Sequence, residues 1–500
     1  MAAKKLNIKD KYRLLTRDLD WEFSYQDRKQ AFPFEEFEGI KITDWSQWED
    51  PFRLTMDAYW KYQAEKERKL YAIFDAFAQN NGQLNISDPR YVNALKIFLT
   101  GVSPLEYQAF QGFAHTGRQF SGVGARVACQ MQAIDELRHV QTQIHAMSHY
   151  NKFFDGLQDW SHMHDRVWYL SVPKSFFNDA RAAGPFEFMV AIGFSFEYVL
   201  TNLLFVPFMS GAAYNGDMAT VTFGFSAQSD EARHMTLGLE VIKFLLEQHE
   251  DNIPIVQKWI DKWFWRGTRL LTIVAMMMDY MLPNKVMSWK EAWEVYFEEA
   301  GGALFKDLAR YGIRMPKYAD LIEQEKEHIS HQAWWTFYTH GHAAGFHTWI
   351  PTDEELDWLS EKYPHTFDQY YRPRWELAKA MEAKGERFYT KALPQLCTTC
   401  QIPMLFTEMD DPTQIAYRES LYQGERYHFC SDGCKDIFDE EPEKYIHSWL
   451  PVHQIFQGQC GGPEVEDILR DYYRMNVGAD NLDMKGSPDE ARWKLWKGVA

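Results

Sequence analysis

Two pentapeptides in this chain are nearly identical: residues 135–139 read DELRH and residues 230–234 read DEARH. On a helix, residues three apart project from the same face, so Glu136 would lie beside His139. The second copy repeats this arrangement. Because a carboxylate and an imidazole one turn apart can bind the same metal ion, the repeat predicts a metal centre between helices.

The residues that flank each pair strengthen this prediction. An Asp precedes each Glu and an Arg precedes each His, at Asp135, Arg138, Asp230 and Arg233. Metal-bound histidines usually donate their second ring N–H to a carboxylate, which fixes the tautomer. We expect Asp135 and Asp230 to supply these carboxylates. The two arginines would pair with the aspartates, as they also would in a purely structural salt bridge.

A metal site in a four-helix bundle needs one more Glu from each of two further helices. The first Glu upstream of DELRH is Glu106, 30 residues before Glu136. Upstream of DEARH, Glu197 lies 34 residues before Glu231 and has a similar spacing. The alternative, Glu187, follows a Gly-Pro pair and is typical of a first helical turn. These spacings predict two antiparallel helix pairs related by a pseudo-twofold axis.

The predicted ligand set fits two iron ions. It comprises Glu106, Glu136, His139, Glu197, Glu231 and His234. The four carboxylates carry a negative charge that two divalent ions would neutralise, as a buried site requires. Oxygen and nitrogen donors without thiolate favour iron or manganese. The alternative is a metal-free network of Glu, His and Arg, in which buried carboxylates would be costly.

Composition narrows the class of protein. The chain has 500 residues, 46% of them apolar, a formal net charge of −18 and six cysteines. The negative charge argues against nucleic-acid binding, and the few cysteines argue against a disulfide scaffold.

The longest apolar run, 270–282, contains Asp279 and is shorter than the roughly 20 residues of a membrane span, so we expect a buried helix. The N-terminus lacks the apolar core of a signal peptide, and we expect a cytoplasmic protein.

Helical periodicity between about 91 and 350 predicts a mostly α-helical fold. We expect a four-helix bundle core of the ferritin-like or ribonucleotide-reductase-like class, with extra helices and a small C-terminal zinc-binding module. The expected parts are an N-terminal arm and helix that contact partners (1–90), the di-iron bundle (91–350), connecting helices (351–395), the zinc module (396–450) and a C-terminal tail (451–500).

Four cysteines form a second metal motif. They are Cys397 and Cys400, with C-x2-C spacing, and Cys430 and Cys434, with C-x3-C spacing. Such a set predicts a tetrahedral structural zinc site, and two pairs of free thiols are the alternative. Cys129 and Cys460 have no partner pattern and are expected to be plain thiols, with Cys129 in the core.

Other histidines are not expected to bind metal. The pairs Glu325/His328 and Glu425/His428 also have E-x-x-H spacing, but they lack the flanking Asp and Arg, and we interpret them as solvated or capping residues. The stretch 328–347 contains His328, His331, His340, His342 and His347. No repeated carboxylate accompanies these rings, so we expect them to be hydrogen-bonded in the interior or at an interface.

Longer segments around the motifs resemble a known family. They include FLTGVSPLEYQAFQGFAHTGRQF (98–120), FGFSAQSDEARHMTLGLEVIKF (223–244), EGIKITDWSQWEDPFRLTMDAYW (38–60) and YHFCSDGCKDIFDEEPEKY (427–445). Over nearly the whole length, the chain resembles the large (alpha) hydroxylase subunit of bacterial multicomponent monooxygenases, above all the phenol hydroxylase branch. The toluene and toluene/o-xylene monooxygenases come next, and soluble methane monooxygenase is more distant.

The resemblance implies a carboxylate-bridged, non-haem di-iron centre that activates O2. Glu106, Glu136 and His139 would bind one iron, and the other three predicted ligands would bind the second. NADH would supply electrons through a separate reductase that carries FAD and a 2Fe–2S cluster. The substrate would be phenol or a methylphenol, and the product a catechol. The chain would be the α subunit of an (αβγ)2 assembly, with β and γ subunits and a small regulatory protein as partners.

The resemblance also implies roles for residues near the iron site. Thr201 would assist proton delivery, while Asn202 and Gln228 would govern access under the control of the regulatory protein. The alternatives are a hydroxyl bonded to its own helix and ordinary surface polar residues. The residues implied to line an apolar substrate pocket are Val102, Phe176, Phe196 and Phe205, for each of which a plain core role is the alternative.

Other functions remain open as alternatives. A toluene/o-xylene or other aromatic or alkene monooxygenase would use the same site, but Leu105 stands where some toluene-oxidising relatives have a second acidic residue, which favours phenol. An iron-binding ferritin-like protein without oxygenase activity would be shorter. A fatty-acyl desaturase would lack Thr201 and the cysteine module, and a ribonucleotide reductase small subunit typically has Asp in place of Glu106. A catalytically inactive scaffold would have lost a ligand.

Overall fold

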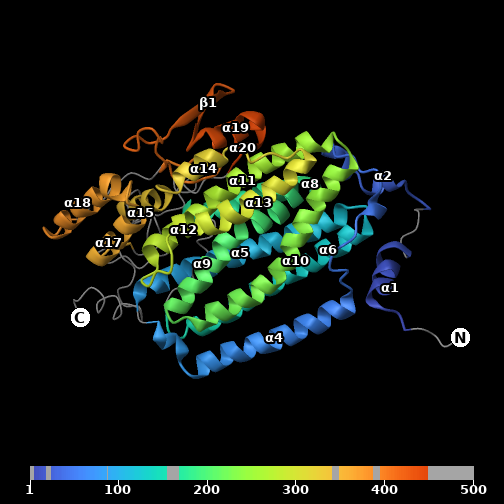
Figure 1. Ribbon diagram of the computed structural model, residues 1–500, viewed down its shortest axis with the longest axis horizontal. Coiled ribbons are helices and arrows are strands. Elements are labelled where there is room, and N and C mark those ends of the chain that lie inside the picture. The colour runs from blue at the N-terminus through green and yellow to red at the C-terminus, as the bar shows by residue number, and fades with distance from the viewer. Residues whose placement is uncertain are drawn as a thin grey trace, which may run out of the picture.

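The computed structural model describes residues 5–18, 24–86, 88–154, 168–340, 348–386 and 395–448. Within these residues, long helices form the body of the molecule, and a small module with a two-stranded hairpin lies at its upper edge in Figure 1. The prediction of a mostly helical fold is confirmed.

Four helices form the central bundle. The first pair is α5 (Pro89–Gln119) and α6 (Val123–Tyr150). The second pair consists of a continuous helix, made of η5 (Met189–Leu200) and α9 (Thr201–Tyr214), and of α10 (Met218–Gln248). A short turn joins the members of each pair, which makes them antiparallel, as the spacing of the glutamates predicts.

Aspartate and tyrosine side chains fix one end of the bundle. The Asp88 side chain caps α5 and the Asp217 side chain caps α10, each accepting a hydrogen bond from a backbone N–H that the helix leaves free. Asp217 also accepts hydrogen bonds from the hydroxyls of Tyr91 on α5 and Tyr150 on α6. This carboxylate therefore joins three of the four bundle helices.

The helix segment η5 has wide, π-helical turns, which the periodicity of the sequence did not predict. Gly193 of η5 lies against Gly238 of α10, where an added Cβ atom would come within 1.8 Å of the Gly193 carbonyl oxygen. The two backbones touch, and only glycine permits so close an approach. Such wide turns are frequent at functional sites in helices, and Glu197 lies in this one.

Among the described residues, one helix, Pro185–Tyr214, is long and apolar enough to cross a membrane by length and composition. Its most apolar window is 78% buried inside the protein, as in the core helix of a globular fold, and a single such helix is weak evidence for a span. The run 270–282 forms the end of α11 (Asn252–Met276) together with η6 (Met277–Met281). It is buried, as predicted.

The N-terminal segment lies on the bundle. Its long helix α4 (Met56–Gln79) runs beside α10 (Figure 1). The Glu38 carboxylate accepts hydrogen bonds from the backbone N–H groups of Phe186 and Glu187 in α8 (Pro185–Phe188), which ties the arm to the second helix pair. The shorter elements here are α1 (Ile8–Arg13), η1 (Leu14–Asp18), α2 (Arg28–Ala31), α3 (Phe34–Phe37), η2 (Trp45–Gln47) and η3 (Gly82–Asn85).

Further helices pack around α11 and η6 and cover the bundle. They are α7 (Trp168–Ala182), α12 (Trp289–Trp293), η7 (Glu294–Glu299), α13 (Ala300–Leu308), η8 (Ala309–Tyr311), α14 (Ala319–Glu325), α15 (Ile329–Thr339), α17 (Asp353–Lys362), η9 (Phe367–Tyr371) and α18 (Arg372–Glu382). The last three lie in the region where the sequence predicts short connecting helices.

The C-terminal module packs on α11. Its elements are β1 (Arg418–Tyr422), β2 (Glu425–Phe429), α19 (Asp432–Glu440) and α20 (Pro442–Tyr445). The strands are antiparallel, with Arg418 opposite Phe429. Gly433 lies against Trp265 of α11, where a Cβ atom would come within 2.4 Å of the indole. In the part of the chain that is described, most buried apolar side chains of the module belong to the same apolar cluster as most of those of α11.

Candidate metal centre

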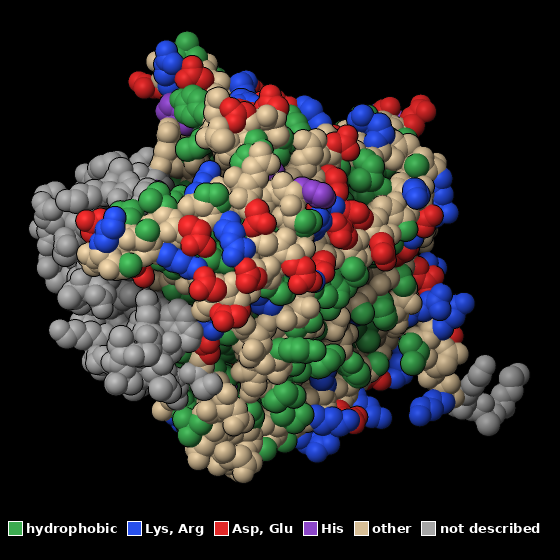
Figure 2. All heavy atoms as spheres, turned by 60° about the vertical axis from the view of Figure 1, so that its left-hand side comes forward, with side chains coloured by type: hydrophobic (Ala, Val, Ile, Leu, Met, Phe, Trp, Pro, Cys, Tyr) green, Lys and Arg blue, Asp and Glu red, His purple; other side chains and the backbone are tan. Residues whose placement is uncertain are grey.

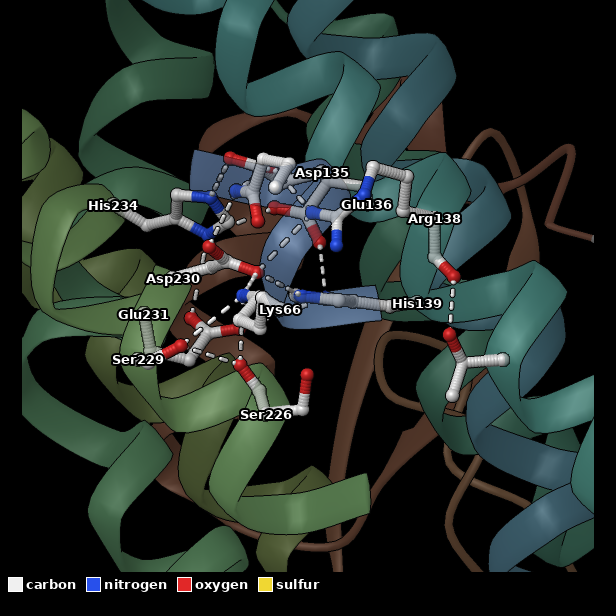
Figure 3. A network of polar contacts seen from close by, with 12 residues as sticks. Lys66, Asp135, Glu136, Arg138, His139, Ser226, Ser229, Asp230, Glu231 and His234 are labelled. Carbon is white, nitrogen blue, oxygen red and sulfur yellow. Dashed lines mark hydrogen bonds and ion pairs between the residues drawn. The ribbon is translucent and has the colours of Figure 1, made fainter. Parts of the chain in front are cut away.

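The bundle helices bring the six predicted ligands together in the interior of the protein, and Figure 3 labels four of them, Glu136, His139, Glu231 and His234. Glu106 comes from α5, Glu136 and His139 from α6, Glu197 from η5, and Glu231 and His234 from α10. None of the six residues is more than 8% exposed. The cluster is therefore shielded from solvent by the helices that carry it.

The first histidine faces carboxylates from three helices. His139 Nδ1 lies 3.5 Å from Glu106 Oε2 and 3.6 Å from Glu136 Oε2. The same atom lies 3.9 Å from Glu231 Oε1. A cation in this position would thus have one imidazole and up to three carboxylates within reach.

The second histidine repeats this geometry. His234 Nδ1 lies 3.2 Å from Glu136 Oε1 and 3.4 Å from Glu231 Oε2. It lies 3.5 Å from Glu197 Oε2. Glu136 and Glu231 therefore contact both histidines, each through two different oxygens, and stand between the two halves of the cluster.

The donor atoms fit hard metal ions. His139 Nδ1, His234 Nδ1 and Glu197 Oε2 are buried and have no hydrogen-bond partner among the described residues. Leaving such an atom unpaired costs roughly 1–3 kcal/mol, a penalty that a bound cation would remove. Two overlapping groups have ligand atoms within 4.8 Å of one another: Glu106, Glu136 and His139, and Glu136, Glu231 and His234.

The buried carboxylates of the cluster would be stabilised by a positive charge between them. Burial raises the pKa of Glu136 well above its usual range, and repulsion from Glu197 adds to this effect. Burial and the neighbouring Glu231 carboxylate raise the pKa of Glu197 to about 8. Although burial disfavours charged imidazoles, the surrounding carboxylates raise the pKa of both His139 and His234 well above the usual value.

Each aspartate of the twin motif supports the histidine of the other copy. His139 Nε2 lies 3.3 Å from Asp230 Oδ2, and His234 Nε2 lies 3.2 Å from Asp135 Oδ2 (Figure 3). Donation from Nε2 leaves Nδ1 free to bind a metal. The spacing of the motif places the aspartates near the rings, but this crossed pairing depends on how α6 and α10 pack.

Three residues of α4, which the sequence analysis did not identify, hold these aspartates. Gln63 Nε2 donates to Asp135 Oδ1 at 2.9 Å and to Asp230 Oδ1 at 2.7 Å, so one amide joins both halves of the site. The Tyr59 hydroxyl donates to Asp135 Oδ1 at 2.7 Å, and the Lys66 ammonium pairs with Asp230 (Figure 3). The only available signal was their spacing of three to four residues on one face of the predicted helix.

The two motif arginines lie beside the aspartates. Arg138 Nη1 lies 3.0 Å from Asp135 Oδ1 and 3.4 Å from Asp230 Oδ2. Its Nε donates to Glu67 of α4 at 2.6 Å. Arg233 pairs with Asp135. The arginines thus offset the charge of the aspartates and add to the contacts between α4 and the bundle.

Two buried amides of α6 orient the glutamates and were also missed from the sequence. Gln132 Nε2 donates to Glu136 Oε1 at 3.2 Å and to Glu197 Oε1 at 3.0 Å. Gln143 Nε2 donates to Glu106 Oε1 at 3.4 Å. Each glutamine lies one helical turn from a predicted ligand on α6, which is a weak signal because glutamine is common in helices.

An apolar cavity of about 90 Å³ adjoins the metal-ligand cluster. Its polar lining consists of Glu106, Glu136, Glu197, Glu231 and Thr201, and its remaining lining is apolar. Val102, Phe196 and Phe205 line this cavity. Phe176 does not belong to this lining; its ring contacts that of Phe196, at 5.4 Å between ring centroids, while the adjacent Phe177 lines the cavity.

Of the three polar residues near the site, only Thr201 lines the cavity. Its hydroxyl donates to the Phe196 carbonyl oxygen at 3.1 Å, the helix bond expected of an ordinary threonine. Asn202 on α9 and Gln228 on α10 are partly exposed and lie outside the cavity lining.

The four cysteines form a second buried cluster. The Cys430 and Cys434 sulfurs lie 3.6 Å apart, and those of Cys400 and Cys430 lie 3.7 Å apart. Thiolates about 2.3 Å from a tetrahedral Zn²⁺ would lie about 3.8 Å apart, so the donor set fits this ion. Cys397 completes the group. The Trp265 indole N–H lies 3.2 Å from the Cys434 sulfur and links the cluster to α11.

Cys129 does not belong to this cluster. Cys129 is buried in the apolar core of the bundle, as predicted. Cys460 lies outside the described residues.

Three of the histidines between 328 and 347 are hydrogen-bonded to other parts of the protein. His328 Nδ1 and His331 Nδ1 lie 2.8 Å and 2.6 Å from tyrosine hydroxyls, and both rings are buried. His340 Nδ1 lies 3.1 Å from a backbone carbonyl of its own helix. The prediction of hydrogen-bonded rings is confirmed for these three, while His342 and His347 lie outside the described residues.

One expectation about the other E-x-x-H pairs is wrong. Glu325 is buried, not solvated, because it forms an ion pair with Arg269 of α11, and His328 is buried near it. Glu425 and His428 lie on strand β2. Residues three apart on a strand point to opposite faces, so this pair cannot act together.

Comparisons with known proteins agree with this geometry. Residues 21–249 match the family described as Methane/Phenol/Alkene Hydroxylase, and residues 406–449 match the YHS domain. The chain is 73% identical over 495 residues to the oxygenase component of phenol 2-monooxygenase from Pseudomonas sp. (strain CF600), which covers 99% of this chain and 96% of that protein. It is 28% identical over 497 residues to the alpha subunit of the alkene monooxygenase oxygenase component from Xanthobacter autotrophicus, with 93% of each chain covered.

A solved structure has the same fold. The X-ray crystal structure of xenon-pressurised phenol hydroxylase from Pseudomonas sp. OX1 matches with a TM-score of 0.94 at 74% identity, covering 98% of this chain and 99% of that one. The family match at 21–249 contains all six residues of the candidate metal centre. The chain therefore belongs to the methane, phenol and alkene hydroxylase family, as the large subunit of a multicomponent monooxygenase.

Proposed function

We propose that this chain hydroxylates phenol and methylphenols to catechols with O2 at a carboxylate-bridged di-iron centre. One observation supports this most strongly: all four glutamates of the metal-ligand cluster line a cavity whose other walls are apolar except for Thr201. An aromatic ring in that cavity would lie directly against the metal ligands. The high identity to a phenol 2-monooxygenase oxygenase component supports phenol as the substrate.

The six clustered residues would divide between two iron ions. Glu106, Glu136 and His139 would hold one ion, and Glu197, Glu231 and His234 would hold the other. Glu136 and Glu231 would lie between the two ions, since each contacts both histidines. Bound iron would supply the redox chemistry that activates O2 for transfer of one oxygen atom to the arene.

The protein's own side chains would orient the substrate and handle protons. Val102, Phe196 and Phe205 would confine the ring and exclude water. Because the Thr201 hydroxyl donates to the Phe196 carbonyl, its oxygen can accept a hydrogen bond from the phenol hydroxyl and assist proton transfer at the cavity wall. Asn202 and Gln228, partly exposed on neighbouring helices, would govern access.

The cysteine cluster would hold one structural zinc ion. Cys397, Cys400, Cys430 and Cys434 are fully buried, and each would contribute a thiolate. All four positions would then be protein ligands, which is typical of a structural site and not of a catalytic one. The ion would fix the module against α11 through Trp265.

Partner proteins would complete the enzyme. We expect NADH to deliver electrons through a separate reductase with FAD and a 2Fe–2S cluster, β and γ subunits to form (αβγ)2, and a small regulatory protein to bind near Asn202 and Gln228. Exposed aromatic residues on the N-terminal segment, such as Tyr25, Phe37 and Trp60, and apolar side chains scattered among charged ones in Figure 2 offer surface for such contacts. Four reduced thiols for zinc favour the cytoplasm.

The test is turnover by the reconstituted system. The complex is supplied with reductase, regulatory protein, NADH, phenol and ¹⁸O2, and we expect ¹⁸O-labelled catechol with a kcat/KM for phenol at least tenfold above that for toluene. Faster oxidation of toluene or an alkene would support the alternative substrate class. Iron uptake without any product would support a ferritin-like binding protein.

A further inference from the structure

A third cluster of metal-binding side chains lies apart from the iron and cysteine clusters. Asp75 of α4 faces His145 and His149, which stand one turn apart on α6. His149 Nε2 lies 3.3 Å from Asp75 Oδ1 and 3.2 Å from His145 Nε2. His145 Nε2 lies 3.5 Å from the same carboxylate oxygen. The three atoms form a nearly equilateral triangle.

The size of this triangle is that of one face of a metal-coordination tetrahedron. Ligand atoms about 2.0–2.1 Å from a tetrahedral Zn²⁺ lie about 3.3 Å from one another, and the ion lies about 0.7 Å out of their plane. The three observed distances, 3.2, 3.3 and 3.5 Å, bracket this value. A cation could therefore bind all three atoms with little movement of the side chains.

The neighbouring residues favour metal binding by the two histidines, because they limit the orientation of one ring and lower the pKa of the other. The rings of Tyr71 and Phe74 on α4 pack against His145, with ring centroids 4.7 Å and 5.9 Å away, and limit its orientation. Burial, followed by electrostatic interaction with His145 and Lys152, lowers the pKa of His149. The His149 ring is therefore neutral near pH 7, the form in which imidazole binds metals.

We propose that Asp75, His145 and His149 form a binding site for a divalent transition-metal ion of the zinc class. Two imidazoles and one carboxylate are ligands that Zn²⁺ accepts, with the fourth position open. The side chains are 51%, 31% and 15% exposed, respectively, so an ion can enter and leave, unlike at the buried cysteines.

An ion at this site would join α4 to α6. Asp75 lies on the same helix as Gln63 and Lys66, which hold the aspartates of the iron site. Metal binding would therefore stiffen the helix that supports the iron centre from outside. The proposed zinc-class site does not depend on the substrate or on hydroxylase activity.

Zinc uptake by the complex tests the proposal. The tag-free hydroxylase is treated with EDTA under conditions that leave iron and cysteine-bound zinc in place, and is then dialysed against micromolar zinc chloride. Elemental analysis is expected to show about one additional Zn²⁺ per chain in the wild type. His145→Ala, His149→Ala and Asp75→Asn are expected to bind this ion at least tenfold more weakly.

The matched control is His249→Ala. His249 also faces a carboxylate, with Nδ1 3.6 Å from Asp251 Oδ2, but no second imidazole accompanies it among the described residues, so the variant should take up zinc like the wild type. The iron content of each sample shows whether a variant has kept its fold. Asp75→Asn is the mildest of the three changes, because the Asp75 side chain is the most exposed of the three. No additional zinc in the wild type, or equal uptake by a correctly folded Asp75→Asn variant, would overturn the proposal.

Discussion

Replacing Gln63 with leucine should weaken both iron positions at once. The Gln63 side chain is 1% exposed and donates to Asp135 and Asp230 at 2.9 Å and 2.7 Å. These aspartates hold His234 and His139 through Nε2. Leucine has a similar volume but donates no hydrogen bond, so both histidines would lose part of their support while the packing of α4 is largely kept.

The expected loss of iron affinity is about tenfold per ion. Hydrogen bonds to charged groups contribute about 1.5–3 kcal/mol, and removing a group that orients a metal ligand typically costs 10–100-fold in metal affinity. Asp135 keeps its hydrogen bonds from Tyr59 and Arg138, and Asp230 keeps Lys66. Since these partners remain, the effect should lie at the lower end of that range.

Competition with an iron chelator measures this loss. The complex is incubated with increasing chelator, and the iron that remains per chain is determined for the wild type, Gln63→Leu and Gln79→Leu. Gln79 is an exposed residue at the end of the same helix and provides the same substitution as a control. The reasoning would be refuted if Gln63→Leu kept both irons at the chelator concentration that Gln79→Leu tolerates, or lost only one of them.

Three further changes have defined outcomes. Val102→Phe should fill the cavity and lower kcat/KM for phenol at least tenfold with unchanged iron content, as shown by turnover and metal analysis. Gly238→Ala should destabilise the fold by at least about 3 kcal/mol, seen as a lower Tm, because its Cβ would meet the Gly193 carbonyl. Burial raises the pKa of Asp279 to about 6, above the unfolded value near 4, so ionisation opposes folding as pH rises between these values. The stability of Asp279→Asn relative to the wild type should therefore increase by up to roughly 3 kcal/mol from pH 4 to 7. The difference in Tm between the two proteins should grow over this range, and a constant difference would contradict the prediction.

The sequence is informative about the ligands because their pattern is local. Glu136 and His139 share a helical face at any packing angle, and the spacing from Glu106 reflects an antiparallel pair with a short turn. The cysteine cluster is predictable for the same reason, since its pairs are close in sequence. In each case, residue type and spacing limit the geometry before any tertiary contact forms.

What the sequence could not predict depends on packing between helices. Gln63 and Tyr59 reach the site only because α4 lies beside α10, and the aspartates cross over because α6 and α10 pack face to face. Phe176 and Phe177 are adjacent apolar residues, and only the rotation of α7 determines which one faces the cavity. Glu325 looks like a surface residue until Arg269 of α11 is placed against it.

Metal analysis of the purified complex tests the two metal assignments most directly. We expect about two iron and one zinc per chain in the wild type once exchangeable zinc has been removed. Glu231→Ala should lose iron and keep zinc, whereas Cys430→Ser should lose zinc and keep iron. A wild-type complex with zinc but no iron would contradict the di-iron assignment, and the twin motif would then be a buried ionic network.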